Sequence, residues 1–61
     1  MKIMMELIAL TPMYEGEQAT FTINGKKYTR VVRYRKSDGL YVVVDNTEYY
    51  EYEFEVRYGE Q

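Results

Sequence analysis

Residues 19–28 read Ala19-Thr-Phe-Thr-Ile-Asn-Gly-Lys-Lys-Tyr28. Side chains that favour strands stand on both sides of Asn24-Gly25, and this dipeptide favours the two-residue type I′ turn of a β-hairpin. A turn of that length places Phe21 directly across from Tyr28. The stretch therefore predicts two antiparallel strands that carry Phe21 and Tyr28 on the same face.

Two more turn signals follow along the chain. Ser37-Asp38-Gly39 suits a three-residue loop with the glycine in the left-handed conformation, which predicts that Tyr34 pairs with Val42. The connection over residues 45–48 must then contain an odd number of loop residues for Val42 to lie beside Tyr50, and we predict three. Four strands joined by three hairpins result.

The last of these strands alternates over nine residues between apolar and charged side chains. Such alternation is typical of a strand that turns one face to the core. Together with the turn assignments, it predicts an inner face made of Ala19, Phe21, Ile23, Tyr28, Val32, Tyr34, Leu40, Val42, Val44, Tyr50, Tyr52, Phe54 and Val56. Arg30 falls on the same face, which requires a strand end, a bulge or a carboxylate partner such as Glu6.

The segment before the hairpins, residues 2–10, is rich in Met, Leu, Glu and Ala and ends at Thr11-Pro12. This composition favours a short helix, and a fifth strand is the alternative because the segment is apolar nearly all round. We expect residues 1–61 to form a single small β-rich domain, of the mainly β or β-rich α+β class. Its predicted architecture is a four-stranded antiparallel meander whose inner face is covered by the N-terminal segment.

The outer face of the predicted sheet carries the candidate binding residues. Residues 26–36 hold six basic and no acidic groups, whereas residues 48–60 hold five acidic groups and one arginine. Basic, apolar and acidic stripes therefore lie side by side, with the candidate partner-binding residues Arg33, Arg35, Tyr41, Val43, Glu51 and Glu53. These residues form either ordinary ion pairs within one chain or an interface with another chain.

The small size of the chain favours self-association. For a chain of 7.4 kDa, apolar burial stabilises the fold by on the order of 97 kcal/mol, and the lost conformational entropy opposes it by about 92 kcal/mol. The two contributions nearly cancel, so a single chain has little net stability. The chain has no cysteine, so a disulfide cannot add stability. We therefore expect a homodimer in which a two-fold axis parallel to the third strand places the basic stripe on the partner's acidic stripe.

The composition argues against catalysis and bound cofactors. The absence of Cys and His removes thiolate nucleophiles, imidazole bases and nearly every transition-metal site. Ser37 is the only serine and lies in a predicted turn, and the carboxylates of residues 51, 53 and 55 are better explained by a solvated strand face than by a metal site. We expect no enzyme activity and no cofactor; the predicted function is a non-catalytic protein-binding or inhibitor module.

Nucleic-acid binding through residues 26–36 is the alternative function. This stretch interleaves basic side chains with Tyr28 and Tyr34, a combination that tracks phosphates and stacks bases. Two observations oppose it: the predicted register turns both tyrosines inward, and glutamates lie on the same sheet of a chain with a pI near 5.0.

Three segments, Ala19-Thr-Phe-Thr-Ile-Asn-Gly-Lys-Lys-Tyr28, Gly39-Leu-Tyr-Val-Val-Val-Asp45 and Tyr49-Tyr-Glu-Tyr-Glu-Phe54, together resemble very small SH3-like β-sheet proteins. The resemblance covers residues 19–56 and implies an SH3-like barrel. A short, acidic, tyrosine-rich chain without Cys or His also resembles the small proteins of bacteriophages and mobile elements, many of which occupy a host protein, anti-defence inhibitors among them. That resemblance implies a host protein as a further partner. Residues 1–10 fit neither a membrane helix nor a secretory signal, so we expect a complete, cytoplasmic protein.

Overall fold

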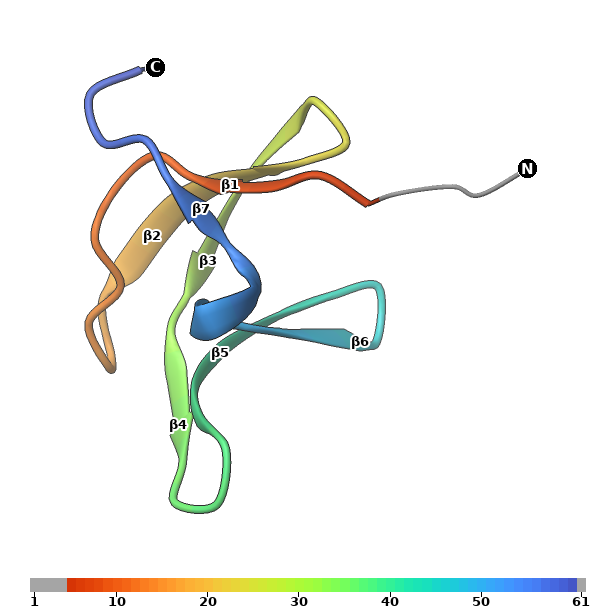
Figure 1. Ribbon diagram of the computed structural model, residues 1–61. Coiled ribbons are helices and arrows are strands. Elements are labelled where there is room, and N and C mark those ends of the chain that lie inside the picture. The colour runs from red at the N-terminus through yellow and green to blue at the C-terminus, as the bar shows by residue number, and fades with distance from the viewer. Residues whose placement is uncertain (1–4, 61) are drawn as a thin grey trace.

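The computed structural model describes residues 5–60, which form seven β-strands and one short 3-10 helix (Figure 1). In chain order these elements are β1 (Leu7–Ala9), β2 (Gln18–Ile23), β3 (Lys26–Val31), β4 (Arg33–Arg35), β5 (Gly39–Val44), β6 (Thr47–Tyr50), the 3-10 helix η1 (Glu51–Glu53) and β7 (Glu55–Val56). The predicted mainly β class is confirmed.

The strands divide between two sheets. A four-stranded sheet has the order β3-β2-β1-β7, and a three-stranded sheet has the order β4-β5-β6. All neighbouring strands are antiparallel except β1 and β7, which are parallel. Over the described residues the sheets do not close into a barrel, so the predicted single meander and the SH3-like barrel are not confirmed.

The predicted N-terminal helix is wrong for the part of residues 2–10 that forms regular structure. Leu7–Ala9 is strand β1, which pairs with β2 so that Ala9 lies opposite Phe21. Pairing with β2 satisfies the backbone of β1 and buries Leu7 and Ala9, and this tertiary contact overrides the helix propensity of the segment. The alternative of a fifth strand holds, while residues 2–4 lie outside the described residues.

The first hairpin forms as predicted. Asn24 and Gly25 have φ angles of 50° and 87°, as a type I′ turn requires, and Phe21 pairs with Tyr28. The turn is also tied to the chain before β1, because Asn24 N donates to the Glu6 carbonyl and Glu6 N donates to Asn24 Oδ1, both at 2.8 Å. The hairpin and β1 are thereby fixed in one register.

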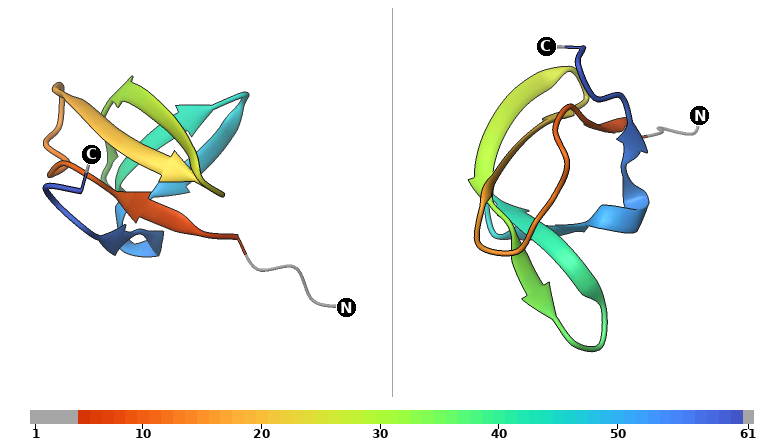
Figure 2. Two further views of the ribbon diagram at one scale, coloured as in Figure 1. Left: turned by 90° about the horizontal axis from the view of Figure 1, so that it is seen from above. Right: turned by 90° about the vertical axis from the view of Figure 1, so that its left-hand side faces the viewer.

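The basic stretch 26–36 bends at Val32 instead of continuing as one strand. Val32 N donates to the Glu17 carbonyl and Gly16 N donates to the Val32 carbonyl, both at 2.9 Å. With its backbone held by the loop before β2 and its side chain buried, Val32 directs the chain from one sheet into the other. Figure 2 shows β3 and β4 as one bent edge, with η1 and β7 on the opposite side of the molecule.

The second hairpin is shifted by two residues from its predicted register. Tyr34 pairs with Leu40 and not with Val42, and the three residues between the paired ends are 36–38. Asp38 N donates to the Arg35 carbonyl at 3.0 Å, so the turn begins one residue earlier than predicted. Gly39 does adopt the predicted left-handed conformation, with a φ of 89°. A shift of two residues preserves the predicted alternation of side chains in this hairpin, although Tyr34 is exposed and does not reach the core.

The third turn has two residues and not the predicted three. Asp45 and Asn46 have φ angles of 51° and 65°, the type I′ pattern, and Val42 pairs with Tyr49. Because Asp and Asn tolerate the left-handed region, this pair can form the tightest hairpin. The change from three loop residues to two moves Tyr50 from the inner to the outer face.

The prediction of a continuous nine-residue final strand is also wrong, because η1 interrupts the chain between β6 and β7. The 3-10 turn rotates the chain so that Phe54 reaches the core, as predicted, although the strand around it is broken. Three residues assigned to the inner face are exposed instead: Tyr34 (52%), Tyr52 (77%) and Val56 (59%). Arg30 is exposed as well, because β3 is an outermost strand and Arg30 lies next to its end.

The core lies between the two sheets and centres on Phe21. Its side chain is fully buried, packs edge-on against Phe54 with ring centroids 5.4 Å apart, and stacks on Tyr28 at 6.0 Å. The buried residues of this cluster are Leu7, Ala9, Met13, Ala19, Phe21, Val32, Val42, Val44 and Phe54. Both sheets and the loop before β2 therefore share one core.

The two-residue turn can be tested at Asn46, whose φ is 65°. Asn46→Val should lower the free energy of unfolding by about 1–2 kcal/mol, because a left-handed conformation is strained for a β-branched residue. Asn46→Gly should not lower it, and Thr47→Val, one residue on in β6, is the matched control. Urea unfolding measures the effect; equal stability of Asn46→Val and Thr47→Val would contradict the turn.

Candidate functional site

The outer face of the β4–β5–β6 sheet gathers four of the six predicted partner-binding residues. Arg33 pairs with Tyr41, and Val43 pairs with Glu48. Since alternate side chains of a strand share a face, Arg35 lies on the same side. We call this surface the outer face; its residues are Arg33, Arg35, Tyr41, Val43, Glu48 and Tyr50.

An arginine–glutamate–tyrosine cluster occupies one end of the outer face. Arg35 Nη1 donates to Glu48 Oε1 at 2.9 Å and Arg35 Nη2 donates to Glu48 Oε2 at 2.8 Å, a bidentate pair. Arg35 Nη1 also donates to Tyr50 Oη at 2.6 Å, and Tyr50 Oη donates to Glu48 Oε1 at 2.6 Å. Each of the three groups thus contacts the other two, which fixes their positions on the sheet.

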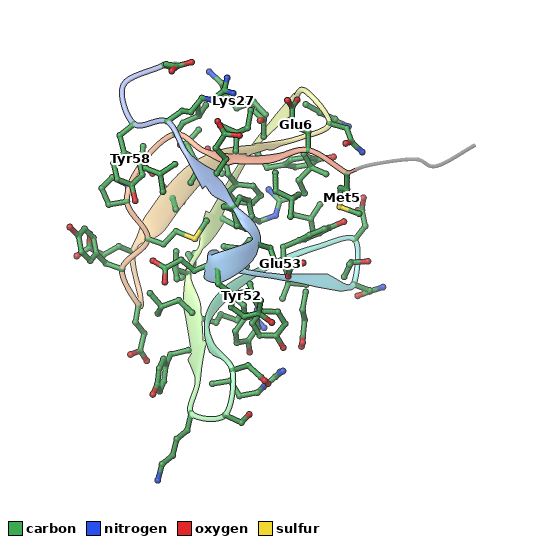
Figure 3. The ribbon with its side chains drawn as sticks, viewed as in Figure 1. Met5, Glu6, Lys27, Tyr52, Glu53 and Tyr58 are labelled. Carbon is green, nitrogen blue, oxygen red and sulfur yellow. The ribbon has the colours of Figure 1, made fainter. Side chains whose placement is uncertain are left out.

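A row of tyrosine rings extends from this cluster toward η1, with Tyr41 and Tyr50 tilted and Tyr50 and Tyr52 stacked. The Arg35 guanidinium lies 4.7 Å from the centroid of the Tyr41 ring, which is buried beneath it. The ring of Tyr50 lies 5.4 Å from Tyr41 and 5.8 Å from Tyr52. Tyr52 is 77% exposed, so the stack ends in an aromatic ring that faces solvent. Figure 3 shows Tyr52 beside the three-stranded sheet, at η1.

The other two predicted residues, Glu51 and Glu53, do not oppose the arginines. Both belong to η1, and Glu53 Oε2 accepts a hydrogen bond from Tyr50 N at 2.9 Å, which caps this short helix. Their predicted place is taken by Glu48. Glu48, Tyr50 and Tyr52 also belong to this surface and were not predicted to do so from the sequence. A two-residue turn at Asp45-Asn46 was the available signal for Glu48 and Tyr50.

The cluster changes the ionisation of its members. Hydrogen bonds, first from Arg35 and then from Tyr50, lower the pKa of Glu48 to about 2. The hydrogen bond to Glu48, followed by partial desolvation, raises the pKa of Tyr50 to about 12. The hydrogen bond to Glu48 also raises the pKa of Arg35 above its ordinary value. The ionic form of the cluster therefore persists over a wide pH range.

Arg33 differs from Arg35 in having no ion-pair partner in the part of the chain that the structure describes. Within residues 5–60 no carboxylate lies within 4.0 Å of its guanidinium, whereas Arg35 contacts both Glu48 and Asp38. Arg33 is exposed on β4, while Val43 on β5 is half-buried. The outer face thus keeps one unpaired cation at its basic margin and Glu48 at its acidic margin.

A second aromatic and basic group lies on β3, away from the outer face. Lys26 Nζ and the Arg30 guanidinium each lie 5.4 Å from the centroid of the Tyr28 ring. One side of this ring stacks on Phe21, and the two cations lie over it as well. Of the strand end, bulge or carboxylate partner expected for Arg30, the structure shows the strand end, and the guanidinium makes this cation–π contact and a hydrogen bond to the Thr29 carbonyl.

The other residues considered for catalysis or metal binding do not come together into a site within residues 5–60. Ser37 donates a hydrogen bond to Asp38 at 3.0 Å in an exposed turn, and the carboxylates of residues 51, 53 and 55 are divided between η1 and β7. Across residues 5–60 no group of three or more acidic side chains converges as metal ligands. The part of the chain that the structure describes contains no helix with the length and apolarity to cross a membrane.

Comparison of the chain with protein-family models, with curated proteins and with solved structures gives no match. The geometry of the two surfaces is therefore the basis for a functional proposal. The outer face offers a preorganised cluster, an exposed ring and an unpaired cation. The β3 strand offers a row of cations on the margin of a sheet.

The stability that the arginine–glutamate–tyrosine cluster contributes should depend on pH. Glu48→Gln should unfold at a lower urea concentration than the unchanged protein at pH 7, because the amide cannot form the bidentate ionic pair with Arg35. The pKa of Glu48 falls from 4.5 to about 2 on folding, so its contribution is complete above pH 4.5 and disappears as the pH falls toward 2. The two proteins should therefore converge in acid. A difference that stays constant between pH 7 and 2 would contradict the ionic cluster.

Proposed function

We propose that this protein is a non-catalytic protein-binding module that forms a homodimer through the outer face. The observation that carries the proposal is the order of charges across this face: unpaired Arg33 on β4, Tyr41 and Val43 on β5, and Glu48 on β6. Such a striped sheet face is complementary to itself when one copy is turned over.

The symmetry of the proposed dimer follows from the stripes. A two-fold axis parallel to β5 brings β4 of one chain over β6 of the other. Arg33 then meets the partner's Glu48, whose carboxylate can accept more than the hydrogen bonds it makes within its own chain. An axis across the strands would instead oppose like charges.

The apolar contact of the proposed interface comes from the rings beside the stripes. Tyr41 is buried under Arg35 and is not available as the central anchor. Tyr52 is exposed and already held by its stack on Tyr50, so its burial would lose little side-chain entropy. We therefore assign the anchor role to Tyr52, with half-buried Val43 beside it.

The biological role that we propose is inhibition of another protein by occupation of its surface, in the cytoplasm. The size and composition of the chain resemble small proteins of phages and mobile elements that block host factors, defence proteins among them. We also propose an SH3-like relationship, which rests on the strand and turn pattern of the sequence over residues 19–56. Proteomic capture on the immobilised protein would identify such a target.

Single-stranded nucleic acid bound along residues 26–36 is a second candidate. One observation favours it: Tyr34, predicted to face inward, is exposed. A second opposes it, because the Tyr28 ring is stacked on Phe21 and covered by Lys26 and Arg30, which leaves little of its face for a base. Protein binding is therefore the favoured function.

Light scattering after gel filtration tests the dimer. The unchanged protein should have twice the mass of the 7.4 kDa chain at micromolar concentration. Arg33→Glu should shift the protein to the monomer, because two glutamates would then face each other across the interface. Tyr52→Ala should raise the dissociation constant of the dimer by about tenfold or more, since anchors of this kind dominate interfaces.

Lys27→Glu is the matched control for charge. It makes the same change in net charge as Arg33→Glu but lies on the four-stranded sheet, so the dimer should persist. A monomeric unchanged protein would overturn the homodimer. Equal dimer stability of Arg33→Glu and Lys27→Glu would exclude this face as the interface.

A further inference from the structure

The β3 strand ends its sheet and has hydrogen-bonding groups free to pair. In the order β3-β2-β1-β7 it lies at one margin, with β2 as its only neighbour in the sheet among residues 5–60. Figure 2 shows β3 along the outside of the molecule, opposite η1 and β7. An outermost strand presents the backbone N–H and C=O groups of alternate residues to solvent.

The backbone of β2 identifies which residues of β3 face outward. The Thr20 carbonyl accepts hydrogen bonds from Leu10 N and Thr11 N, and Thr20 N donates to Thr11 Oγ1, so both Thr20 backbone groups point toward the β1 side. Its opposite residue, Thr29, is therefore in a pair without backbone hydrogen bonds, and the Thr29 backbone points away from β2. By alternation, Lys27 and Val31 point the same way. We call these three residues the β3 edge.

The side chains around the β3 edge are basic and accessible. Lys26, Lys27 and Arg30 are exposed, β3 contains no carboxylate, and none of these three cations has an ion-pair partner among residues 5–60. Val31 is 49% exposed beside the free backbone groups. Lysine on a sheet edge commonly prevents pairing between copies, and here an antiparallel pair of β3 strands would bring the basic side chains of both copies close together.

We propose that the β3 edge binds an extended acidic segment of a partner protein as an added strand. The backbone groups of residues 27, 29 and 31 would pair with the segment, the Thr29 carbonyl through the lone pair that its hydrogen bond from Arg30 Nη1 leaves free. Carboxylates of the segment would lie against Lys27 on one face of the sheet or against Lys26 and Arg30 on the other. The same charges that prevent pairing with a second copy attract this partner. The covered ring of Tyr28 and the outward peptide groups favour a peptide over a nucleic acid as the occupant.

The bend at Val32 sets the length of the added strand. Both backbone groups of Val32 bond to the loop before β2, so the free edge ends at Val31. Residues 27–31 accommodate a segment of about five residues, or roughly 17 Å of extended chain. This surface lies on the four-stranded sheet, so it can be occupied while the outer face of the other sheet forms a dimer.

Titration with a synthetic peptide tests the proposal. The probe is acetyl-Glu-Val-Glu-Val-Glu-Val-Glu-amide, and binding is measured by calorimetry at low salt. Two N-methylated versions, one methylated at the valines and the other at the glutamates, remove alternate N–H groups without changing the charge. Only one set of N–H groups can face β3, so one version should bind at least about tenfold more weakly than the other.

Protein variants separate the backbone from the charges. Thr29→Pro removes an outward N–H and should abolish binding, while Lys27→Glu should weaken binding of the glutamate peptide at least about tenfold. Circular dichroism checks that both variants fold. If Thr29→Pro does not fold, the two N-methylated peptides still test whether backbone hydrogen bonds are needed for binding. Tyr52→Ala should bind the peptide normally, which keeps this result independent of the dimer.

Three outcomes would overturn the proposal. Equal affinity of the two N-methylated peptides would reduce the contact to charge attraction alone. Equal affinity of a glutamine version of the peptide would remove the acidic preference. Tighter binding of a thymidine oligonucleotide of about twelve nucleotides than of the peptide, with loss in Lys27→Glu, would assign the strand to nucleic acid instead.

Discussion

Two hydrogen bonds to the backbone of Val32 determine which surfaces this protein can offer. They join Val32 to Gly16 and Glu17 and bend the basic stretch into β3 and β4. Without the bend, the cations of residues 26–36 would alternate along one strand of one sheet. With it, β4 contributes Arg33 and Arg35 to the face of the three-stranded sheet, while β3 keeps its cations on a free edge.

The register of the β5–β6 hairpin has an equally local origin. Asp45 and Asn46 both adopt left-handed conformations, and a two-residue turn then brings Glu48 to the face that carries Arg35. A loop one residue longer would turn Glu48 toward the core and leave Arg35 without its bidentate partner. The arginine–glutamate–tyrosine cluster is therefore a consequence of turn chemistry.

The sequence predicts what is local and fails where distant segments decide. The Asn24-Gly25 turn, the Phe21–Tyr28 pair and most of the core follow from dipeptide preference and alternation. The break at Val32 could not be predicted, because it depends on a loop more than ten residues away. Alternation around residues 50–58 was misleading, since it continues through η1. Of the predicted site, Arg33, Arg35, Tyr41 and Val43 share a face; Glu51 and Glu53 do not.

The separated charges have a different physical role on each of the two sheets. On β4, the charge of Arg35 is neutralised within the chain, and its guanidinium serves as a rigid cover for Tyr41. On β3, Lys27 has no ion-pair partner among residues 5–60, and a lysine on the margin of a sheet disfavours pairing with a second β3 strand. In the proposed dimer, a chain with so small a core would gain from this division, because one face would bury apolar area between copies while the edge stays unpaired. The edge is then free for a strand of opposite charge, which no segment within residues 5–60 supplies to it.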